Sequence, residues 1–222
     1  MKKYALLSLL LFISSALFAQ EKSNTEEENV CIHKGNVTFS VGYGAPSIVR
    51  TYLKLKNAHA DFKIVGWGPY MFKVDYLLRN KWSIGLNFTY NFSRISWMDD
   101  GYDTVIHGKR PYEYGIEAED FSLTCRANYH FIRSKKMDVY AGLGAGYGKI
   151  TLGTYTEAPL NQFSVGYAFP RPLSVETTIG IRYYIIKNIA IYSELGMGKS
   201  WILFKKYFIP ESIIQGGIHF KI

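Results

Sequence analysis

The sequence has 222 residues and a formal net charge of +8. This basic excess is mild and spread along the chain, whereas nucleic-acid binding needs basic residues gathered on one face, so we expect no nucleic-acid partner. Beyond the N-terminal segment, no stretch approaches the ~18 consecutive apolar residues of a transmembrane helix. A secreted soluble domain and a membrane β-barrel remain, and the 18 Tyr, 14 Phe, 20 Gly and 4 Trp favour the alternating strands of a barrel.

The N-terminus has the three-part layout of a secretory signal peptide. Two lysines precede an uncharged apolar run that is shorter than the ~20 residues needed to span a bilayer. We predict cleavage after Ala19, and cleavage after Ala16 is the alternative because Leu17 is large for its place two residues before Ala19. The predicted parts of the chain are the signal peptide (1–19), a periplasmic leader (20–33) and a barrel domain (34–222).

Cys31 and Cys125 are the two cysteines of the chain. An exported protein can oxidise its thiols, but Cys31 precedes the first expected strand and Cys125 lies in the middle of another, among outward-facing residues. We therefore predict that they are unpaired. No Cys or His pair has the spacing of zinc ligands, so we expect neither a metal nor a cofactor.

From Lys34 onward, apolar and polar residues alternate with the period of two that is typical of half-buried strands. The clearest case places Trp82, Ile84 and Leu86 on one face and Ser83 and the next odd-numbered residues on the other. Each segment reaches the ~9–11 residues of a transmembrane strand. The predicted strands are 34–44, 67–79, 82–96, 119–133, 137–152, 173–187, 189–202 and 212–222.

The expected connections alternate between short and long, which distinguishes a membrane barrel from a soluble β-sandwich. Short turns are expected at 80–81, 134–136 and 187–188, and aromatic residues lie near many strand ends, where the headgroups of a membrane would be. Outer-membrane barrels have short periplasmic turns and longer extracellular loops. The sequence therefore predicts an all-β fold, an eight-stranded antiparallel up-and-down transmembrane β-barrel. The longer connections are expected at 45–66, 97–118, 153–172 and 203–211.

Two segments carry a family resemblance. The run Val139–Gly148 (VYAGLGAGYG) and the closing strand Gly217–Ile222, together with the signal peptide, resemble the small outer-membrane barrels of the OmpA and OmpX type. The resemblance implies a place in the cell outer membrane, contact with its lipid and lipopolysaccharide, and insertion by the barrel assembly machinery. It implies almost nothing about activity. Such barrels often end in an aromatic residue, whereas this chain ends in Ile222 with Phe220 two residues before it.

Charged residues fall on the predicted inward faces of the strands. The interior of an eight-stranded barrel is just wide enough to be filled by side chains, so buried charges must pair. We predict that Arg126 and Arg182 bridge Glu176 and Glu194 and plug the lumen, whereas Arg79, His219 and Lys221 are solvated at the rims. Glycines at alternate positions of 142–148 leave room for large neighbours. The predicted lumen network consists of Lys73, Asp75, Arg126, Glu176, Arg182 and Glu194.

No nucleophile motif supports an enzyme, because His130 and Ser134 would lie about 13 Å apart along one strand. The remaining candidates for function are the long loops, because binding residues concentrate on loops held by a rigid scaffold. We predict a non-enzymatic outer-membrane barrel with a structural or surface-interaction role, and the alternatives are a narrow pore and a lipid A-modifying enzyme. The candidate extracellular contacts are Tyr52, Lys54, Lys56, His107, Lys109, Arg110, Tyr155 and Arg171.

Overall fold

The structure is a computed structural model that describes most of the chain beyond its N-terminal segment. The predicted signal peptide, its cleavage site and most of the predicted leader lie outside the described residues. The same holds for most of the first predicted loop. The described residues are 30–45, 51, 62–103, 106–157, 166–202, 205–207 and 214–222.

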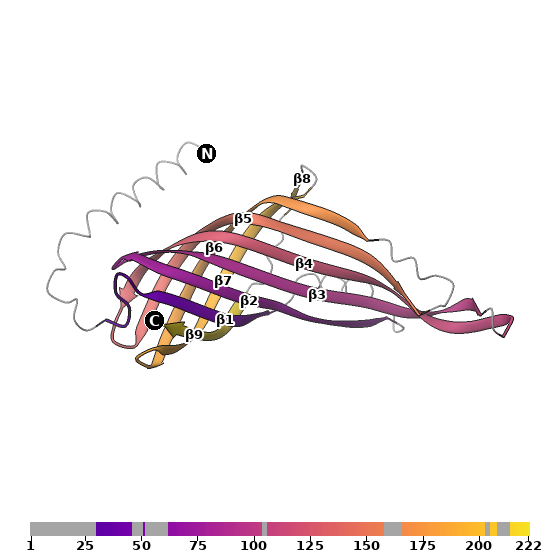
Figure 1. The fold of residues 1–222 in the computed structure, drawn as a ribbon, viewed down its shortest axis with the longest axis horizontal. Coiled ribbons are helices and arrows are strands. Elements are labelled where there is room, and N and C mark those ends of the chain that lie inside the picture. Colours follow the sequence, from indigo (N-terminus) through magenta and orange to yellow (C-terminus); the bar gives the residue numbers. More distant parts are fainter. Residues whose placement is uncertain are drawn as a thin grey trace. The chain divides into compact units, whose positions relative to one another are not determined.

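The described chain is built almost entirely of antiparallel strands (Figure 1). The strands from β1 to β7 pair in sequence order, and β7 also pairs with β9. β9 closes the ring by pairing with β1, where Phe39 lies opposite Phe220. Within the described residues, eight strands form this ring, and the short β8 pairs with β7 outside it. The strands are β1 (Val37–Ala45), β2 (Lys63–Arg79), β3 (Trp82–Asp103), β4 (Gly108–Arg133), β5 (Met137–Thr156), β6 (Tyr167–Ile186), β7 (Ile189–Ile202), β8 (Lys205–Tyr207) and β9 (Ile214–Lys221).

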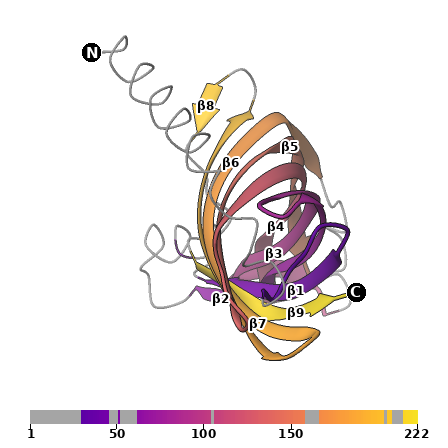
Figure 2. The ribbon, with the colours of Figure 1, turned by 90° about the vertical axis from the view of Figure 1, so that its left-hand side faces the viewer.

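The eight predicted ring strands and the up-and-down order are confirmed, and Figure 2 shows the strands curving round the barrel axis. The short connections fall at residues 80–81, 134–136 and 187–188, as predicted. They lie at the same end of the barrel as the C-terminus (Figure 1). This end is called the turn end below, and the opposite end is called the hairpin end.

The prediction of a long loop at 97–118 is wrong. β3 and β4 continue as a paired hairpin as far as Asp103 opposite Gly108. Beyond Ser96, β3 has β4 as its one described neighbour, because β2 begins opposite that residue at Lys63. The alternation fades in this hairpin because both faces of a ribbon outside the barrel wall meet water, so nothing in the pattern marks it as a strand.

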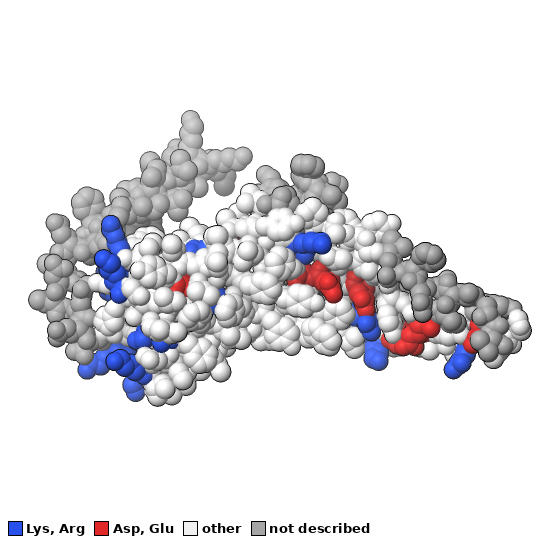
Figure 3. Space-filling view, in the orientation of Figure 1, with Lys and Arg blue, Asp and Glu red and all other residues white. Residues whose placement is uncertain are grey.

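The outer wall of the barrel is apolar between two levels. Along β3 the outward residues from Trp82 to Phe92 are apolar or aromatic, and Leu86 is 48% exposed between them. The ten steps between the eleven residues from Trp82 to Phe92, at ~3.4 Å each and a tilt of about 40°, give a belt of about 26 Å, close to the ~25 Å of outer-membrane barrels. On the face shown in Figure 3, most Lys and Arg side chains lie at the turn end, and most Asp and Glu side chains lie toward the hairpin end.

Aromatic pairs mark both borders of this belt. Trp82 and Tyr129 pack at the turn end with ring centroids 5.0 Å apart. Trp67 stacks on Phe92 at the hairpin end, with centroids 5.2 Å apart and planes 30° apart. Amphipathic rings at two such levels are typical of the two headgroup regions of a membrane.

A small apolar cluster lies at the turn end of the barrel. Cys31 lies across the mouth, since its backbone N–H donates to the Ser134 carbonyl at 2.8 Å. Lys221 donates from its ammonium to the Cys31 carbonyl at 2.5 Å. This contact explains why the prediction of a solvated Lys221 is wrong, although Arg79 is exposed as expected. The mouth cluster consists of Cys31, Ile32, Leu77, Tyr184 and Ala190.

No helix in the described part of the chain is both long enough and apolar enough to cross a membrane.

Candidate functional site

Charged side chains from several strands meet inside the barrel. Glu194 on β7 receives hydrogen bonds from Lys73, from Tyr140 and, at 2.9 Å, from Arg126 Nη2. Lys73 also donates to Gln215 Oε1 at 2.7 Å. A fully buried carboxylate is costly without such partners, because burial removes the water that would solvate it.

A second set of ion pairs continues toward the turn end. Arg182 donates to Asp75 Oδ2 at 2.7 Å and to Asp138 Oδ2 at 3.3 Å. Asp75 also lies 3.5 Å from Arg126 Nε, so it joins the two sets. The lumen network as observed therefore has three cations and three anions, all with side chains at most 1% exposed: Lys73, Arg126, Arg182, Asp75, Asp138 and Glu194.

The expected bridging differs from the observed contacts in two ways. Arg182 contacts Asp75 and Asp138 rather than Glu176 or Glu194, because Asp138 lies directly opposite Arg182 in the β5–β6 register. Glu176 is half-buried and accepts a hydrogen bond from Thr124 Oγ1 at 2.9 Å. The sequence analysis did not assign Asp138 and Tyr140 to the lumen network, although both lie on the same face of β5 as the lumen-facing glycines that follow them.

Two glycines make the room that these large side chains occupy. A Cβ added to Gly180 would lie 2.5 Å from Tyr140 Cζ, and one added to Gly144 would lie 2.7 Å from Glu176 Cγ. Both distances are shorter than a van der Waals contact. The prediction that lumen glycines leave space for neighbours is therefore confirmed at Gly144, where the neighbour is Glu176.

Two buried histidines lie at the turn-end side of the network. His219 is fully buried between Ser40 Oγ, at 2.8 Å from Nδ1, and the Tyr184 hydroxyl, at 3.1 Å from Nε2. The prediction of a solvated His219 is therefore wrong. Its side chain points into the barrel, because His219 belongs to the same alternating set of buried positions on β9 as Gln215 and Lys221.

The other histidine, His130, belongs to an arrangement of three residues that resembles a catalytic triad. Its Nε2 lies 3.0 Å from Ser83 Oγ, and its Nδ1 lies 2.8 Å from Asp138 Oδ1. Nucleophile, base and orienting acid are in the order of a serine hydrolase. Ser83, His130 and Asp138 are all fully buried, and Asn128 also donates to Ser83 Oγ at 3.1 Å. An enclosed hydroxyl of this kind cannot meet a substrate, so we interpret the three residues as part of the packing.

The hairpin half of the lumen is polar but carries few charges. Thr89, Ser93 and Ser96 on β3 and Ser122 on β4 are buried, and their hydroxyls have no hydrogen-bond partner within the described residues. Buried hydroxyls of this kind are ordinarily satisfied by water. The lumen therefore changes along its axis, from uncharged hydroxyls at the hairpin end to paired charges at the turn end.

The predicted loop contacts fall into three groups in the structure. Tyr52, Lys54 and Lys56 lie outside the described residues. Tyr155 and Arg171 belong to β5 and β6 rather than to loops. The remaining three lie at the tip of the β3–β4 hairpin: His107, Lys109 and Arg110.

Asp103 holds the tip of this hairpin together. It accepts a hydrogen bond from the Tyr112 hydroxyl at 2.7 Å and lies 3.9 Å from Arg110 Nη1. The hydrogen bond to Asp103 raises the pKa of the Tyr112 phenol. His107 turns the chain with a φ of 49°, a left-handed conformation that histidine adopts more readily than bulky apolar residues.

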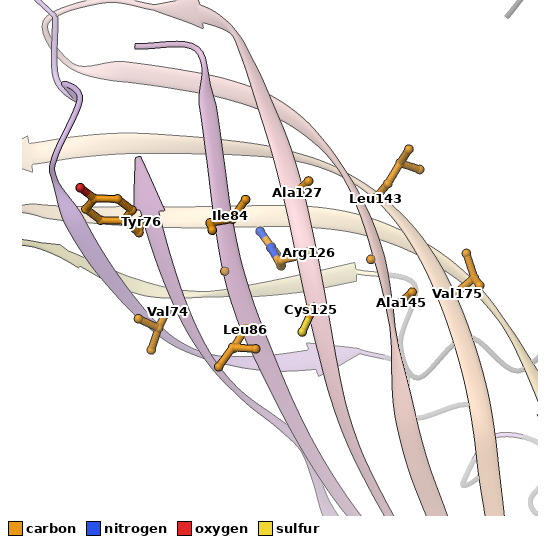
Figure 4. A pocket seen from close by; sticks show the side chains of 12 residues that line it. Val74, Tyr76, Ile84, Leu86, Cys125, Arg126, Ala127, Leu143, Ala145 and Val175 are labelled. Carbon is orange, nitrogen blue, oxygen red and sulfur yellow. The ribbon is translucent and has the colours of Figure 1, made fainter. Parts of the chain in front are cut away.

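The outer wall has a shallow apolar hollow of about 810 Å³ in the middle of the belt (Figure 4). The small side chains of Cys125, Ala127 and Ala145 lie between larger ones such as Leu86 and Leu143. Both cysteines are free thiols, Cys31 buried and Cys125 exposed on this wall. No group of His, Cys, Asp and Glu within the described ranges is arranged to hold a metal ion.

No family model matches the sequence, and no curated protein sequence matches it. Among solved structures, the chain is similar to the attachment invasion locus protein Ail of Yersinia pestis, with 14% identity over 85% of this chain and 99% of that chain and a TM-score of 0.44. It is also similar to the N-terminal β-barrel domain of Pseudomonas aeruginosa OprF, with 11% identity over 86% and 100% of the two chains and a TM-score of 0.42. The outer membrane protein OprG of the same organism gives 12% identity, 86% and 97% coverage and a TM-score of 0.47.

The strand register and the two faces of the wall carry the assignment of the fold. A closed ring leaves no strand edge unpaired, which is the condition for crossing a bilayer with strands. The wall is apolar outward and polar inward, and aromatic residues border the belt. The chain is therefore an eight-stranded β-barrel of the outer-membrane type.

Proposed function

We propose that this barrel is a non-enzymatic outer-membrane protein that keeps its lumen closed and acts through the surface of its hairpin end. The proposed orientation in the membrane has the turn end facing the periplasm and the hairpin end facing the exterior, because outer-membrane barrels have short periplasmic turns and longer extracellular connections. The observation that carries the proposal is the lumen network, in which three cations and three anions pair across the barrel.

The charges of the network hold one another in place. A side chain that moved aside would leave its partner charged and buried, at a cost of about 3–5 kcal/mol. The mouth cluster adds an apolar layer below the charges, in which Ile32 and Leu77 are fully buried. Two successive layers of different chemistry therefore support a closed lumen.

The β3–β4 hairpin supports a surface-interaction role. Within the described residues, 97–102 and 109–112 pair with each other and with no third strand, so both edges of this ribbon are strand edges. Such edges accept an added strand from a partner. Exposed Met98 and Ile106 give the ribbon apolar contact area beyond the membrane belt. We expect its partners to be other surface molecules, in addition to the surrounding lipid and lipopolysaccharide and the assembly machinery that inserts the barrel.

A narrow pore is the second candidate, because the hydroxyl-lined half of the lumen could hold water down to the network. Conductance across planar bilayers separates the two functions. For the closed barrel we expect no steady channel from the purified protein, and we expect Glu194→Ala to give frequent openings and to lower the free energy of unfolding by about 3–5 kcal/mol. Large, stable channels from the unsubstituted protein would contradict the closed lumen.

The matched control for this substitution is Glu119→Ala. Glu119 is also a glutamate on a ring strand, but it is exposed on the outer face. Removing it leaves every contact of the lumen network in place. Equal conductance from the two variants would show that Glu194 does not hold the lumen closed.

A further inference from the structure

The outer wall carries a second hollow, of about 580 Å³, at the hairpin-end border of the apolar belt. Its floor and sides come from β2, β3 and β4. Unlike the hollow around Cys125, it combines aromatic and charged side chains. Its principal lining residues, called the outer-wall site below, are Val65, Trp67, Phe92, Arg94 and Glu117.

The strand register places these residues in two adjacent rows across the wall. Trp67 lies opposite Phe92, and Val65 lies opposite Arg94, which in turn lies opposite Glu117. The rows are two residues apart along the strands, or about 7 Å. This spacing is close to the width of one sugar ring, so a single ring can contact both rows.

The first row provides an aromatic platform. Trp67 is 56% exposed and stacks on Phe92, which fixes the orientation of the indole. The face of an indole carries partial negative charge, and the C–H groups on one face of a sugar carry partial positive charge, so the two pack together favourably.

The second row provides a fixed pair of polar groups. Arg94 Nε donates to Glu117 Oε1 at 2.7 Å, and the Arg94 guanidinium carbon lies 4.0 Å from the centre of the Tyr155 ring. Both charged side chains remain 29% exposed. The remaining guanidinium donors and carboxylate lone pairs can therefore bind the hydroxyl groups of a ligand.

The charge of the pair decides which class of ligand suits the site. Arg94 and Glu117 cancel each other, so an anion such as a phosphate gains little from binding here, whereas a neutral polyol finds both donors and acceptors. The site also faces away from the barrel axis, and its Arg94–Glu117 row lies one row beyond the apolar belt that ends at Phe92. In the orientation given above, this is the level of the headgroups of the outer leaflet.

We propose that the outer-wall site binds a sugar ring from the headgroup of a glycolipid in the outer leaflet, with the ring on Trp67 and its hydroxyls on Arg94 and Glu117. This proposal rests on the proposed place of the barrel in the outer membrane. It assigns a defined contact with the sugar portion of the surrounding glycolipid, which is separate from any partner of the hairpin.

The test uses the folded full-length protein in detergent micelles and native mass spectrometry to count bound lipids. The probes are a rough lipopolysaccharide that carries core sugars, phosphatidylglycerol, which has charge but no sugar ring, and the free core oligosaccharide. We expect the lipopolysaccharide to bind tightest, and Trp67→Leu or Glu117→Gln to weaken it by roughly tenfold or more.

Matched controls exist for both substitutions. Trp82 is an exposed tryptophan on the same wall but at the turn-end border, and Asp100 is an exposed carboxylate of the β3–β4 hairpin that does not line the hollow. Trp82→Leu and Asp100→Asn should bind lipopolysaccharide as the unsubstituted protein does. Equal binding by all four variants would overturn the site, as would equal binding of phosphatidylglycerol.

Two further outcomes are informative. One shows whether the sugar comes from a glycolipid or is free, and the other shows whether the outer-wall site or the proposed function has failed. Free oligosaccharide that binds as tightly as the lipopolysaccharide would overturn the glycolipid source. Each preparation is also checked for the shift in gel mobility on boiling that folded barrels give. A normal shift with no effect of Trp67→Leu would overturn the outer-wall site alone, whereas no shift in any sample would overturn the proposed function.

Discussion

Cys31 is a single residue whose chemistry reports on the closure of the turn end. Its thiol approaches the Met137 carbonyl at 3.5 Å within the mouth cluster. Burial, with a smaller contribution from the charge of Asp138, raises the pKa of the Cys31 thiol from 9.0 to about 11. The protonated thiol is therefore the form that the folded mouth accommodates.

This shift predicts how the closure depends on pH. Because the folded pKa lies above the ordinary value, the thiol stabilises the closed mouth fully below pH 9, and this contribution is lost as pH rises from about 9 to about 11. We expect iodoacetamide to modify Cys31 slowly at pH 8 and much faster near pH 11. Mass spectrometry of the modified peptide measures the rate, and Cys31→Ser removes the signal. Fast modification at pH 8 would show that the mouth is open.

The lumen network shows what residue patterns can and cannot predict. The alternation of apolar and polar residues along the strands was enough to identify Lys73, Asp75, Arg126, Arg182 and Glu194 as inward-facing. It could not identify their partners, because these depend on the stagger of strands that are distant in sequence. Lys73 and Glu194, for example, are 121 residues apart and lie on strands that do not pair.

At the scale of the strands, the strand boundaries could be predicted within the apolar belt but not beyond it. Inside the belt, one face meets hydrocarbon and the other meets the lumen, so alternation is strong, and the turns at 80–81 and 187–188 were predicted to the residue. Outside the belt both faces meet water, and the pattern loses its meaning. This is why β3 and β4 extend past their predicted ends.

The tip of the β3–β4 hairpin gives a prediction at this scale. Asp103→Ala removes the acceptor of the Tyr112 hydroxyl and the ion-pair partner of Arg110. We expect trypsin to cut after the exposed Lys109 roughly fivefold faster in this variant, because the tip opens more often. Limited proteolysis followed by mass spectrometry measures the rate.

The matched control is Asp99→Ala. Asp99 is an exposed aspartate of the same hairpin, and its side chain accepts a hydrogen bond from the backbone N–H of Asp100. We expect this variant to be cut at the rate of the unsubstituted protein. If Asp103→Ala were cut no faster than Asp99→Ala, Asp103 would not hold the tip together.

At the scale of the whole molecule, the fold follows from the closure of the ring, whereas the function depends on what the ring encloses and displays. The sequence predicted the closure through strand number and turn lengths. It did not predict the mouth cluster, because Cys31 and Ile32 precede the first strand and have no periodic neighbours. It did not predict the outer-wall site either, because Trp67, Arg94 and Glu117 come together only through the register of three strands.

The measurement that tests the central claim most directly is the gel mobility of the protein from the outer-membrane fraction, with and without boiling in detergent. A closed ring of eight strands has no free edge from which to unravel, so it should keep its compact form in detergent until heated. We predict a clear difference in mobility between the two samples, in the outer-membrane fraction. A protein that is soluble in the periplasm and migrates identically before and after boiling would contradict the barrel.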